Sequence, residues 1–227
     1  MTAPTDAEAE LVVTKLGHAC VRLERGASRL VVDPGVFSDP GALEGAGAVL
    51  ITHQHPDHLD PARVSAAIDA DPGLQVWGPA DAVDRLGGPG ERLRVAATGD
   101  RFTAAGFEVA VVGEWHAVIH PDIPPMRNVG YLIDGLVLHP GDALTVLDAG
   151  VDTLLLPVCA PWLKLGEVID YVRAVAPRQA LPVHDTTYSA AGLAIVHRQL
   201  GPDGVGIAPT TYVNWADGDR VVVPAAG

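Results

Sequence analysis

The sequence predicts an α/β protein built as a two-sheet sandwich in a single domain. Its 227 residues are enough to bury a large core, and 48% of them are hydrophobic against 19% charged. Short apolar segments with the composition of strands recur along the chain, and segments with helical patterning follow them. Strands followed by helices occur in two rounds, which suits two sheets packed together.

The first round of strands leads into two helices. Residues 48–51 are apolar without alternation and then stop abruptly, which is typical of a buried strand. Asp60 suits the N-cap of a helix, Pro61 suits its first position, and Gly73 follows its end. The predicted elements are strands at 11–14, 20–24, 29–33, 48–51 and 74–77 and helices at 61–70 and 79–86.

The second round contains the clearest hairpin, within residues 128–142. Asp134-Gly135 is a favoured two-residue turn between two apolar segments. Residues 165–176 carry apolar side chains on one face and charges on the other, which indicates an amphipathic helix. The other predicted elements are strands at 93–96 and 107–113 with a turn at Gly99-Asp100, strands at 153–157, 179–184 and 220–224, and a helix at 189–200.

The ends and the cysteines of the chain predict a cytoplasmic protein. Residues 1–10 have neither the basic region nor the apolar core of a secretory signal, so we expect a disordered tail followed by one domain over 11–227. No apolar run approaches the ~18 residues of a membrane span. Cys20 and Cys159 make neither a disulfide framework nor a thiolate metal site.

The charge balance favours a small-molecule substrate over nucleic acid. The net charge is −13, with 28 acidic residues against 15 basic ones, and no cluster of Lys or Arg offers a local site for phosphates. A small phosphorylated substrate stays compatible with this balance. We expect no nucleic-acid or membrane partner, and the sequence does not indicate an oligomeric state.

The predicted strand at 48–51 runs directly into a loop with four side chains that can bind metal, in the pattern H-x-H-x-D-H over residues 53–58. We call this segment the metal loop. His53 and His55, two apart in an extended segment, point the same way and can hold one cation. Asp57 and His58 follow a proline that turns the chain, so they face a second position a few Å away. Two metal ions ~3.5–4 Å apart are the usual geometry of two-metal sites.

This loop resembles the hallmark of the metallo-β-lactamase superfamily, and three later segments continue that family's pattern in order. His116 follows the strand at 107–113, Asp142 follows the hairpin in a Gly-Asp pair, and His184 ends a later strand. The resemblance covers roughly residues 11–215 and implies a four-layer αββα sandwich with the metals at one edge, between the sheets. The short hairpin and compact size look most like the small bacterial branch that includes L-ascorbate-6-phosphate lactonase.

The resemblance also implies a site with two divalent ions, for which zinc suits the ligand set and manganese or iron are alternatives. A hydroxide bridging the two ions would attack an ester, lactone or phosphodiester. Asp57 and Asp142 would be catalytic, because they orient this hydroxide and can carry its proton. One ion would take His53, His55 and His116, the other Asp57, His58 and His184, with Asp142 bridging.

Two residues before the loop have alternative interpretations. Asp33 ends a buried strand, where an aspartate is most often a turn or cap residue. The resemblance implies instead that Asp33 supports the metal loop from behind. His18 reaches the mouth of the site or is a surface or capping histidine. His139, beside the Gly-Asp pair, is expected to be structural.

Four residues are candidates for substrate contacts. Arg127 and Lys164 could bind an anionic group, Trp162 could line the pocket, and His120 lies four residues beyond His116. The alternatives are an exposed loop histidine for His120, and a hydrophobic anchor with a solvated charge for Trp162 and Lys164.

Three other functions compete with that of a small-molecule hydrolase. A nuclease or phosphodiesterase of the same superfamily is disfavoured by the acidic balance and the lack of an extra domain. A di-iron redox protein on this scaffold is also disfavoured, because such proteins normally carry a fused flavin domain, which 227 residues cannot hold. A non-enzymatic metal-binding protein would not need so complete a set of ligands with two carboxylates. Hydrolysis of β-lactams is disfavoured because no export signal is present.

Overall fold

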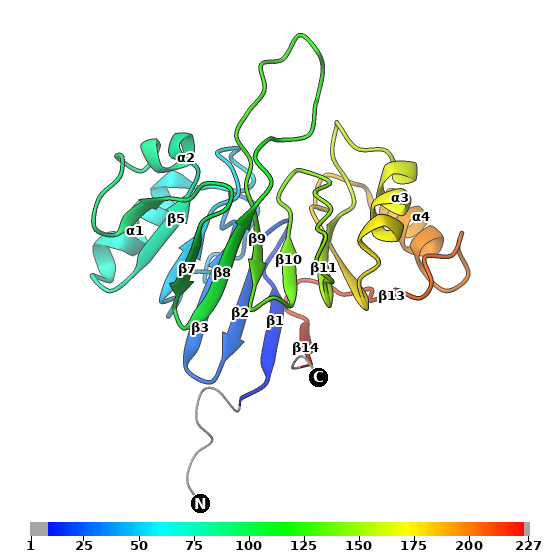
Figure 1. The fold of residues 1–227 in the computed structure, drawn as a ribbon, viewed down its shortest axis with the longest axis horizontal. Coiled ribbons are helices and arrows are strands. Elements are labelled where there is room, and N and C mark those ends of the chain that lie inside the picture. Colours follow the sequence, from blue (N-terminus) through cyan, green and yellow to red (C-terminus); the bar gives the residue numbers. More distant parts are fainter. Residues whose placement is uncertain (1–8, 225–227) are drawn as a thin grey trace, which may run out of the picture.

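The structure is a computed structural model that describes residues 9–224. The predicted tail at residues 1–10 therefore lies almost wholly outside the described residues, as do residues 225–227. Within the described range the chain forms two seven-stranded sheets and four helices (Figure 1). The helices are α1 (Pro61–Ala70), α2 (Ala80–Asp84), α3 (Leu165–Val175) and α4 (Ala190–Leu200).

The two sheets have the same arrangement of strand directions. In each sheet, the strands that come first in the sequence pair antiparallel with their neighbours. The strands that come next in the sequence pair parallel. The first sheet has the order β14 (Arg220–Val223), β1 (Leu11–Lys15), β2 (Val21–Arg25), β3 (Ser28–Val32), β4 (Ala48–Leu50), β5 (Gln75–Gly78) and β6 (Leu93–Val95). The second has the order β13 (Thr211–Tyr212), β12 (Gln179–Val183), β11 (Thr153–Pro157), β10 (Val137–His139), β9 (Gly130–Ile133), β8 (Phe107–Val112) and β7 (Arg101–Ala104).

Alternating side chains of the strands build three apolar layers. Leu50 points into the core between the sheets, where it joins Phe107 and Leu155. Its neighbours on the opposite face of β4 pack under α1 and α2, and the outer face of β11 packs under α3 and α4. This is the predicted four-layer αββα sandwich, with one pair of helices on each outer face (Figure 1). None of the described helices has the length and apolar character needed to cross a bilayer.

The strand directions bring the predicted site residues to one edge of the sandwich. Strands β1, β3 and β4 of the first sheet run the same way, as do β8, β10 and β12 of the second. The segments that follow these six strands contain all the residues predicted to bind metal, and with them Asp33 and His18. Sites in α/β sheets commonly form at such carboxyl ends.

Two hydrogen bonds join the sheets just before the predicted metal loop. The Tyr131 hydroxyl on β9 donates to the Ile51 carbonyl at 2.7 Å, and the Val129 N–H donates to the Thr52 carbonyl at 2.9 Å. Tyr131 is fully buried, so its hydroxyl needs this partner. The contact fixes the start of the loop against the second sheet.

Two strands were not expected from the sequence, and both are edge strands of the second sheet. In strand β7 only Ala104 is buried, and β13 has only two residues, so neither carries a clear apolar pattern. The prediction that Gly99-Asp100 joins two successive strands was wrong, because β7 lies between them. The segment at residues 96–100 instead carries the chain from the edge of the first sheet to the edge of the second.

Replacing Tyr131 by phenylalanine tests the link between the sheets. We expect Tyr131→Phe to lower the free energy of unfolding by about 1–3 kcal/mol, because the Ile51 carbonyl stays buried without its donor. Urea denaturation followed by circular dichroism measures this difference. Tyr188→Phe, at an exposed ring, is the control and should change stability by less than about 0.5 kcal/mol. Equal effects of the two substitutions would contradict the assignment.

Candidate metal centre

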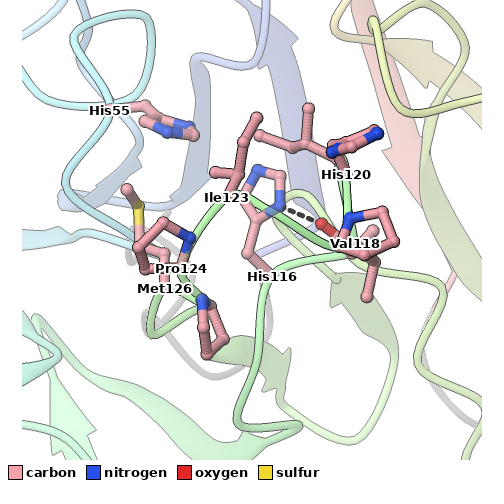
Figure 2. Close-up of a pocket in the computed structure, with 11 residues that line it drawn as sticks. His55, His116, Val118, His120, Ile123, Pro124 and Met126 are labelled. Carbon is pink, nitrogen blue, oxygen red and sulfur yellow. Dashed lines mark hydrogen bonds between the residues drawn. The ribbon is translucent and has the colours of Figure 1, made fainter.

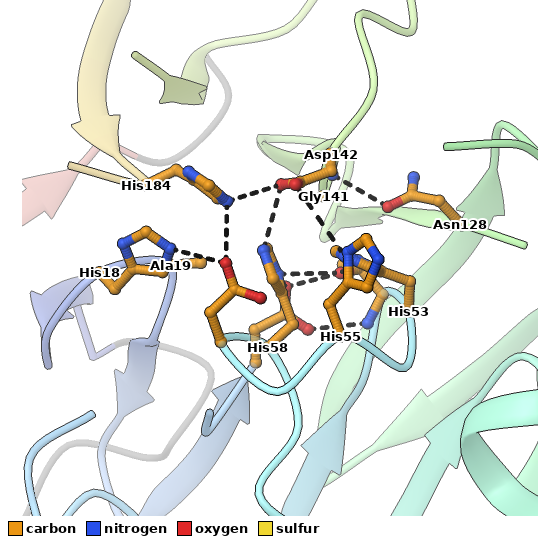
Figure 3. Close-up of polar contacts among 12 residues, drawn as sticks. His18, Ala19, His53, His55, His58, Asn128, Gly141, Asp142 and His184 are labelled. Carbon is orange, nitrogen blue, oxygen red and sulfur yellow. Dashed lines mark hydrogen bonds and ion pairs between the residues drawn. The ribbon is translucent and has the colours of Figure 1, made fainter. Parts of the chain in front are cut away.

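Eight side chains that can bind metal converge at the edge of the sandwich (Figure 3). They form two groups, and within each group one potential ligand atom per residue lies within 4.8 Å of the others. The first group contains His53, His55, His116 and Asp142, and the second contains His18, Asp57, His58 and His184.

The structure thus brings together every residue predicted to bind metal, in the predicted division, and adds one. His18, left open by the sequence, is fully buried and its Nε2 lies 3.2 Å from Asp57 Oδ2. His184 Nε2 approaches the same oxygen from the other sheet at 3.4 Å. The second group therefore has three imidazoles around one carboxylate.

Asp142 lies between the two groups. Its Oδ2 is 3.3 Å from His116 Nε2 in the first group. Its Oδ1 is 3.1 Å from His58 Nε2 and 3.2 Å from His184 Nε2 in the second. One oxygen of Asp142 thus faces each group, which is the arrangement that a bridging carboxylate needs.

Hydrogen bonds behind the imidazoles orient them towards the centre of the cluster. His58 Nδ1 donates to Asp33 Oδ2 at 2.7 Å, His116 Nδ1 donates to the Ala117 carbonyl at 2.6 Å, and His184 Nδ1 donates to the Cys159 carbonyl. In each ring Nδ1 is thus the donor that fixes the ring, and Nε2 points inward. Metal-binding histidines in proteins are held in this way.

The inward-facing atoms lack hydrogen-bond partners among the described residues. His58 Nε2, His116 Nε2, His184 Nε2 and Asp142 Oδ1 are all buried, and none of them makes a hydrogen bond. Buried polar atoms without partners are costly, so four of them facing one centre point to a bound ion. Imidazole nitrogens and carboxylate oxygens without a thiolate fit divalent ions such as zinc, manganese or iron.

The electrostatics of the cluster favour cations. Burial on its own would raise the pKa of Asp142, but His58 and the other imidazoles hold it well below its ordinary value, and His18 and His184 do the same for Asp57. Burial is the main cause that lowers the pKa of His53. Burial on its own would lower the pKa of His58 and His184, but the carboxylates around them hold the pKa of His58 well above its ordinary value and raise that of His184 to about 9. Two ionised carboxylates thus attract positive charge to the centre, which protons on these imidazoles supply without an ion and a bound cation would supply in their place.

Asp33 supports the metal loop through three contacts. Its Oδ1 accepts from the Thr52 N–H at 2.7 Å, and its Oδ2 accepts from the Thr52 hydroxyl at 2.6 Å as well as from His58. Because the Thr52 hydroxyl proton goes to Asp33, its oxygen is free to accept from His53 Nδ1 at 3.1 Å. One buried carboxylate therefore sets the orientation of two histidines.

Close backbone approaches hold the loops in place at two glycines. A Cβ on Gly35 would lie 2.0 Å from the Asp57 carbonyl oxygen, so only glycine allows this contact. Gly141 has a φ of +62°, and a Cβ there would lie 2.3 Å from Asn128 Oδ1. Both glycines set the position of a carboxylate beside them.

Asn128 was not identified from the sequence, although it holds Asp142. It is fully buried, its Oδ1 accepts from the Asp142 N–H at 2.9 Å, and its Nδ2 donates to the Pro140 carbonyl at 2.9 Å. A single asparagine in a loop belongs to no recognisable sequence motif. Its contact with Asp142 forms only because the hairpin of β9 and β10 brings the two residues together. His139 beside it is structural as expected: its Nε2 donates to the Ala19 carbonyl at 2.9 Å.

Of the four candidate substrate contacts, Trp162 lies at the centre and His120 lies at the rim of the cavity beside it. The Trp162 indole donates to Asp142 Oδ2 at 3.1 Å, and its ring makes an edge contact with that of His116. Trp162 therefore positions the carboxylate as well as closing that side of the centre. His120 is exposed at the rim of a cavity that His55 and His116 also line (Figure 2).

The other two lie elsewhere. Arg127 pairs with Glu114, its guanidinium lies 4.1 Å above the Trp115 ring, and it lines a different cavity with residues such as Pro79. Lys164 is exposed at the start of α3, where its backbone N–H donates to Glu167. Contact of either with a substrate stays a prediction.

Replacing Asp33 tests its support of the loop. We expect Asp33→Asn to weaken metal binding about 10–100-fold, because asparagine keeps one acceptor oxygen for the Thr52 and His58 donors that two oxygens now serve. Asparagine tolerates the φ of +52° at this position. Competition with a chromophoric chelator measures the affinity. Asp148→Asn, at an exposed aspartate, is the control. Unchanged affinity in Asp33→Asn would show that the contact is dispensable.

Replacing His18 tests its membership of the second group. We expect His18→Asn to reduce bound metal from two ions to one per chain, since asparagine tolerates the φ of +53° but removes the imidazole. Metal content after dialysis, measured by mass spectrometry, gives this ratio. His120→Asn should keep both ions, and two ions in His18→Asn would exclude His18 from the site.

Comparison with known proteins assigns the family. A family model described as a beta-lactamase superfamily domain matches residues 12–184. The protein Rv0786c of Mycobacterium tuberculosis is 39% identical over 194 residues, which covers 83% of this chain and 90% of that protein. A Thermus thermophilus protein named as a UPF0173 metal-dependent hydrolase is 26% identical over 221 residues, covering 87% of this chain and 96% of that one.

A solved structure agrees at the level of the fold. The metallo-beta-lactamase fold protein YhfI of Bacillus subtilis superposes with a TM-score of 0.70 at 15% identity, covering 95% of this chain and 100% of that one. The particular similarity to L-ascorbate-6-phosphate lactonases stays a prediction. With the two ligand groups at the expected edge of the sandwich, the sequence match and the fold agree that the chain belongs to the metallo-β-lactamase superfamily.

Proposed function

We propose that the protein is a hydrolase with two divalent metal ions that acts on a small ester, lactone or phosphodiester. The observation that carries this proposal is the pair of ligand groups with one oxygen of Asp142 facing each. The Thermus relative named as a metal-dependent hydrolase supports the reaction class. Two ions at such a site supply an activated water at neutral pH and polarise the substrate oxygen.

The two carboxylates have different surroundings, and we assign them different roles. The Asp142 side chain is 4% exposed and is fixed by Asn128 and Trp162, so it positions the ligands around it. The Asp57 side chain is 24% exposed, and only its Oδ2 faces His18 and His184. Asp57 stays ionised, because His18 and His184 lower its pKa, and its other oxygen can accept a hydrogen bond from a water molecule, which is what a general base must do.

Histidines of the first group border the open side of the centre. His55 is half-buried and lines the same cavity as His116, whereas His53 is fully buried. A substrate entering through this cavity meets His55 and His116 first. Its scissile bond would then lie between the cavity and Asp57.

Turnover of a small substrate panel tests the proposal. Protein reconstituted separately with zinc and with manganese is assayed on a phosphodiester, a lactone, a thioester and a β-lactam. We expect turnover of one class that a chelator and His116→Ala both abolish. We expect Asp57→Asn to lower kcat by at least about 10²-fold, because the substitution removes both the proposed general base and a ligand of the second group.

Asp148→Asn is the matched control and should retain wild-type kcat, because Asp148 is exposed and belongs to neither ligand group. Turnover that survives both metal removal and His116→Ala would contradict the proposal.

A further inference from the structure

A cavity of about 290 Å³ opens directly beside the first ligand group (Figure 2). His55 and His116 form its inner side. The opposite side is formed by the loop that follows His116, through Val118, Ile123, Pro124 and Met126. In Figure 1 this loop is the long green segment that projects beyond the ends of β8 and β9. Anything bound in the cavity lies against two candidate metal ligands.

The cavity has apolar walls. Among the described residues that line it, histidines provide the only polar side chains, and none is Lys, Arg, Asp or Glu. The nearby Arg127 is held by Glu114 and Trp115 and lines another cavity. Beyond the metal centre, an anionic group would meet no lysine or arginine among these lining residues, whereas an apolar group would be sheltered from water.

The loop exposes apolar side chains that folding alone does not explain. Val118 is 75% exposed and Ile123 is 48% exposed, on a protein with a net charge of −13. Exposed apolar groups gathered at one place usually mark a binding surface. Pro121, Pro124 and Pro125 fix φ along the loop, so it loses little conformational freedom when it binds.

We propose that this cavity receives the apolar part of the substrate, which is an ester or lactone carrying an alkyl chain of several carbons. The inference rests on the proposed function, since the reacting carbonyl must lie at the metal centre. Continuity through His55 and His116 favours a substrate group over a second copy of the chain, which would not need contact with the centre. The volume suits a short chain and not a whole lipid.

Binding of linear alkyl hydroxamates of increasing length tests the proposal. The hydroxamate head binds metal ions and the alkyl tail probes the cavity, so neither part requires turnover. On zinc-loaded wild-type protein, titration calorimetry should show the Kd falling by up to about fourfold per added methylene, from acetohydroxamate until the cavity is full. We expect Ile123→Asn to flatten this dependence, because it places an amide on the apolar wall.

Ile195→Asn is the matched control. Ile195 is 52% exposed on α4 and does not line the cavity, so this variant should keep the wild-type dependence on chain length. Circular dichroism of both variants checks that they fold.

Because the hydroxamate head reports on the metal centre and the alkyl tail on the cavity, the experiment distinguishes failure of this inference from failure of the proposed function. If acetohydroxamate binds but chain length has no effect, the cavity proposal is overturned and the metal centre stands. If acetohydroxamate does not bind but longer chains bind in an Ile123-dependent way, the cavity binds alkyl chains, but the two-metal function is overturned and with it the assignment of the cavity to a substrate of that centre. If no hydroxamate binds, both proposals fall.

Two further results would overturn the cavity proposal alone. A chain-length dependence that persists in Ile123→Asn would place the tail elsewhere. Sedimentation that shows a wild-type dimer and an Ile123→Asn monomer would identify the occupant as a second copy of the chain.

Discussion

The buried carboxylate of Asp142 is the constraint around which this end of the molecule is arranged. Three imidazole nitrogens face its two oxygens without forming hydrogen bonds to any described atom, and its other contacts come from Asn128 and Trp162. Such an arrangement is unfavourable unless positive charge occupies the space between these atoms. The tight turn at Gly141 and the hydrogen bonds behind the histidines all serve to maintain it.

The layers of the fold could be predicted because each depends on local patterning. Runs such as residues 153–157 read as buried strands whatever their neighbours are, and parallel strands buried on both faces need such runs. Strands β7 and β13 could not be predicted in this way, since an exposed edge strand is defined by its partner and not by its own residues. The crossing between the sheets at residues 96–100 was not predicted either, because it can be recognised only once β7 is known to be a strand.

The residues of the site also fall into those that a sequence pattern reveals and those that only their partners in the fold reveal. The metal loop and the residues at 116, 142 and 184 were found because they form a pattern in the sequence, and the structure gathers them. His18 and Asn128 carry no such pattern, and their contacts exist only after β1 and β9 are packed beside the loop. Arg127 shows the converse: its charge suggested an anion contact, but Glu114 and Trp115 already hold it.

Each ligand group draws its members from both halves of the sandwich. The first joins His53 and His55 of the first sheet to His116 and Asp142 of the second, and the other joins Asp57 and His58 to His184. A bound ion would therefore act as a cross-link between two halves that otherwise meet through an apolar core and hydrogen bonds such as that of Tyr131. Metal supply would then set how firmly the halves are clamped, and resistance of the fold to heat would rise with free metal concentration.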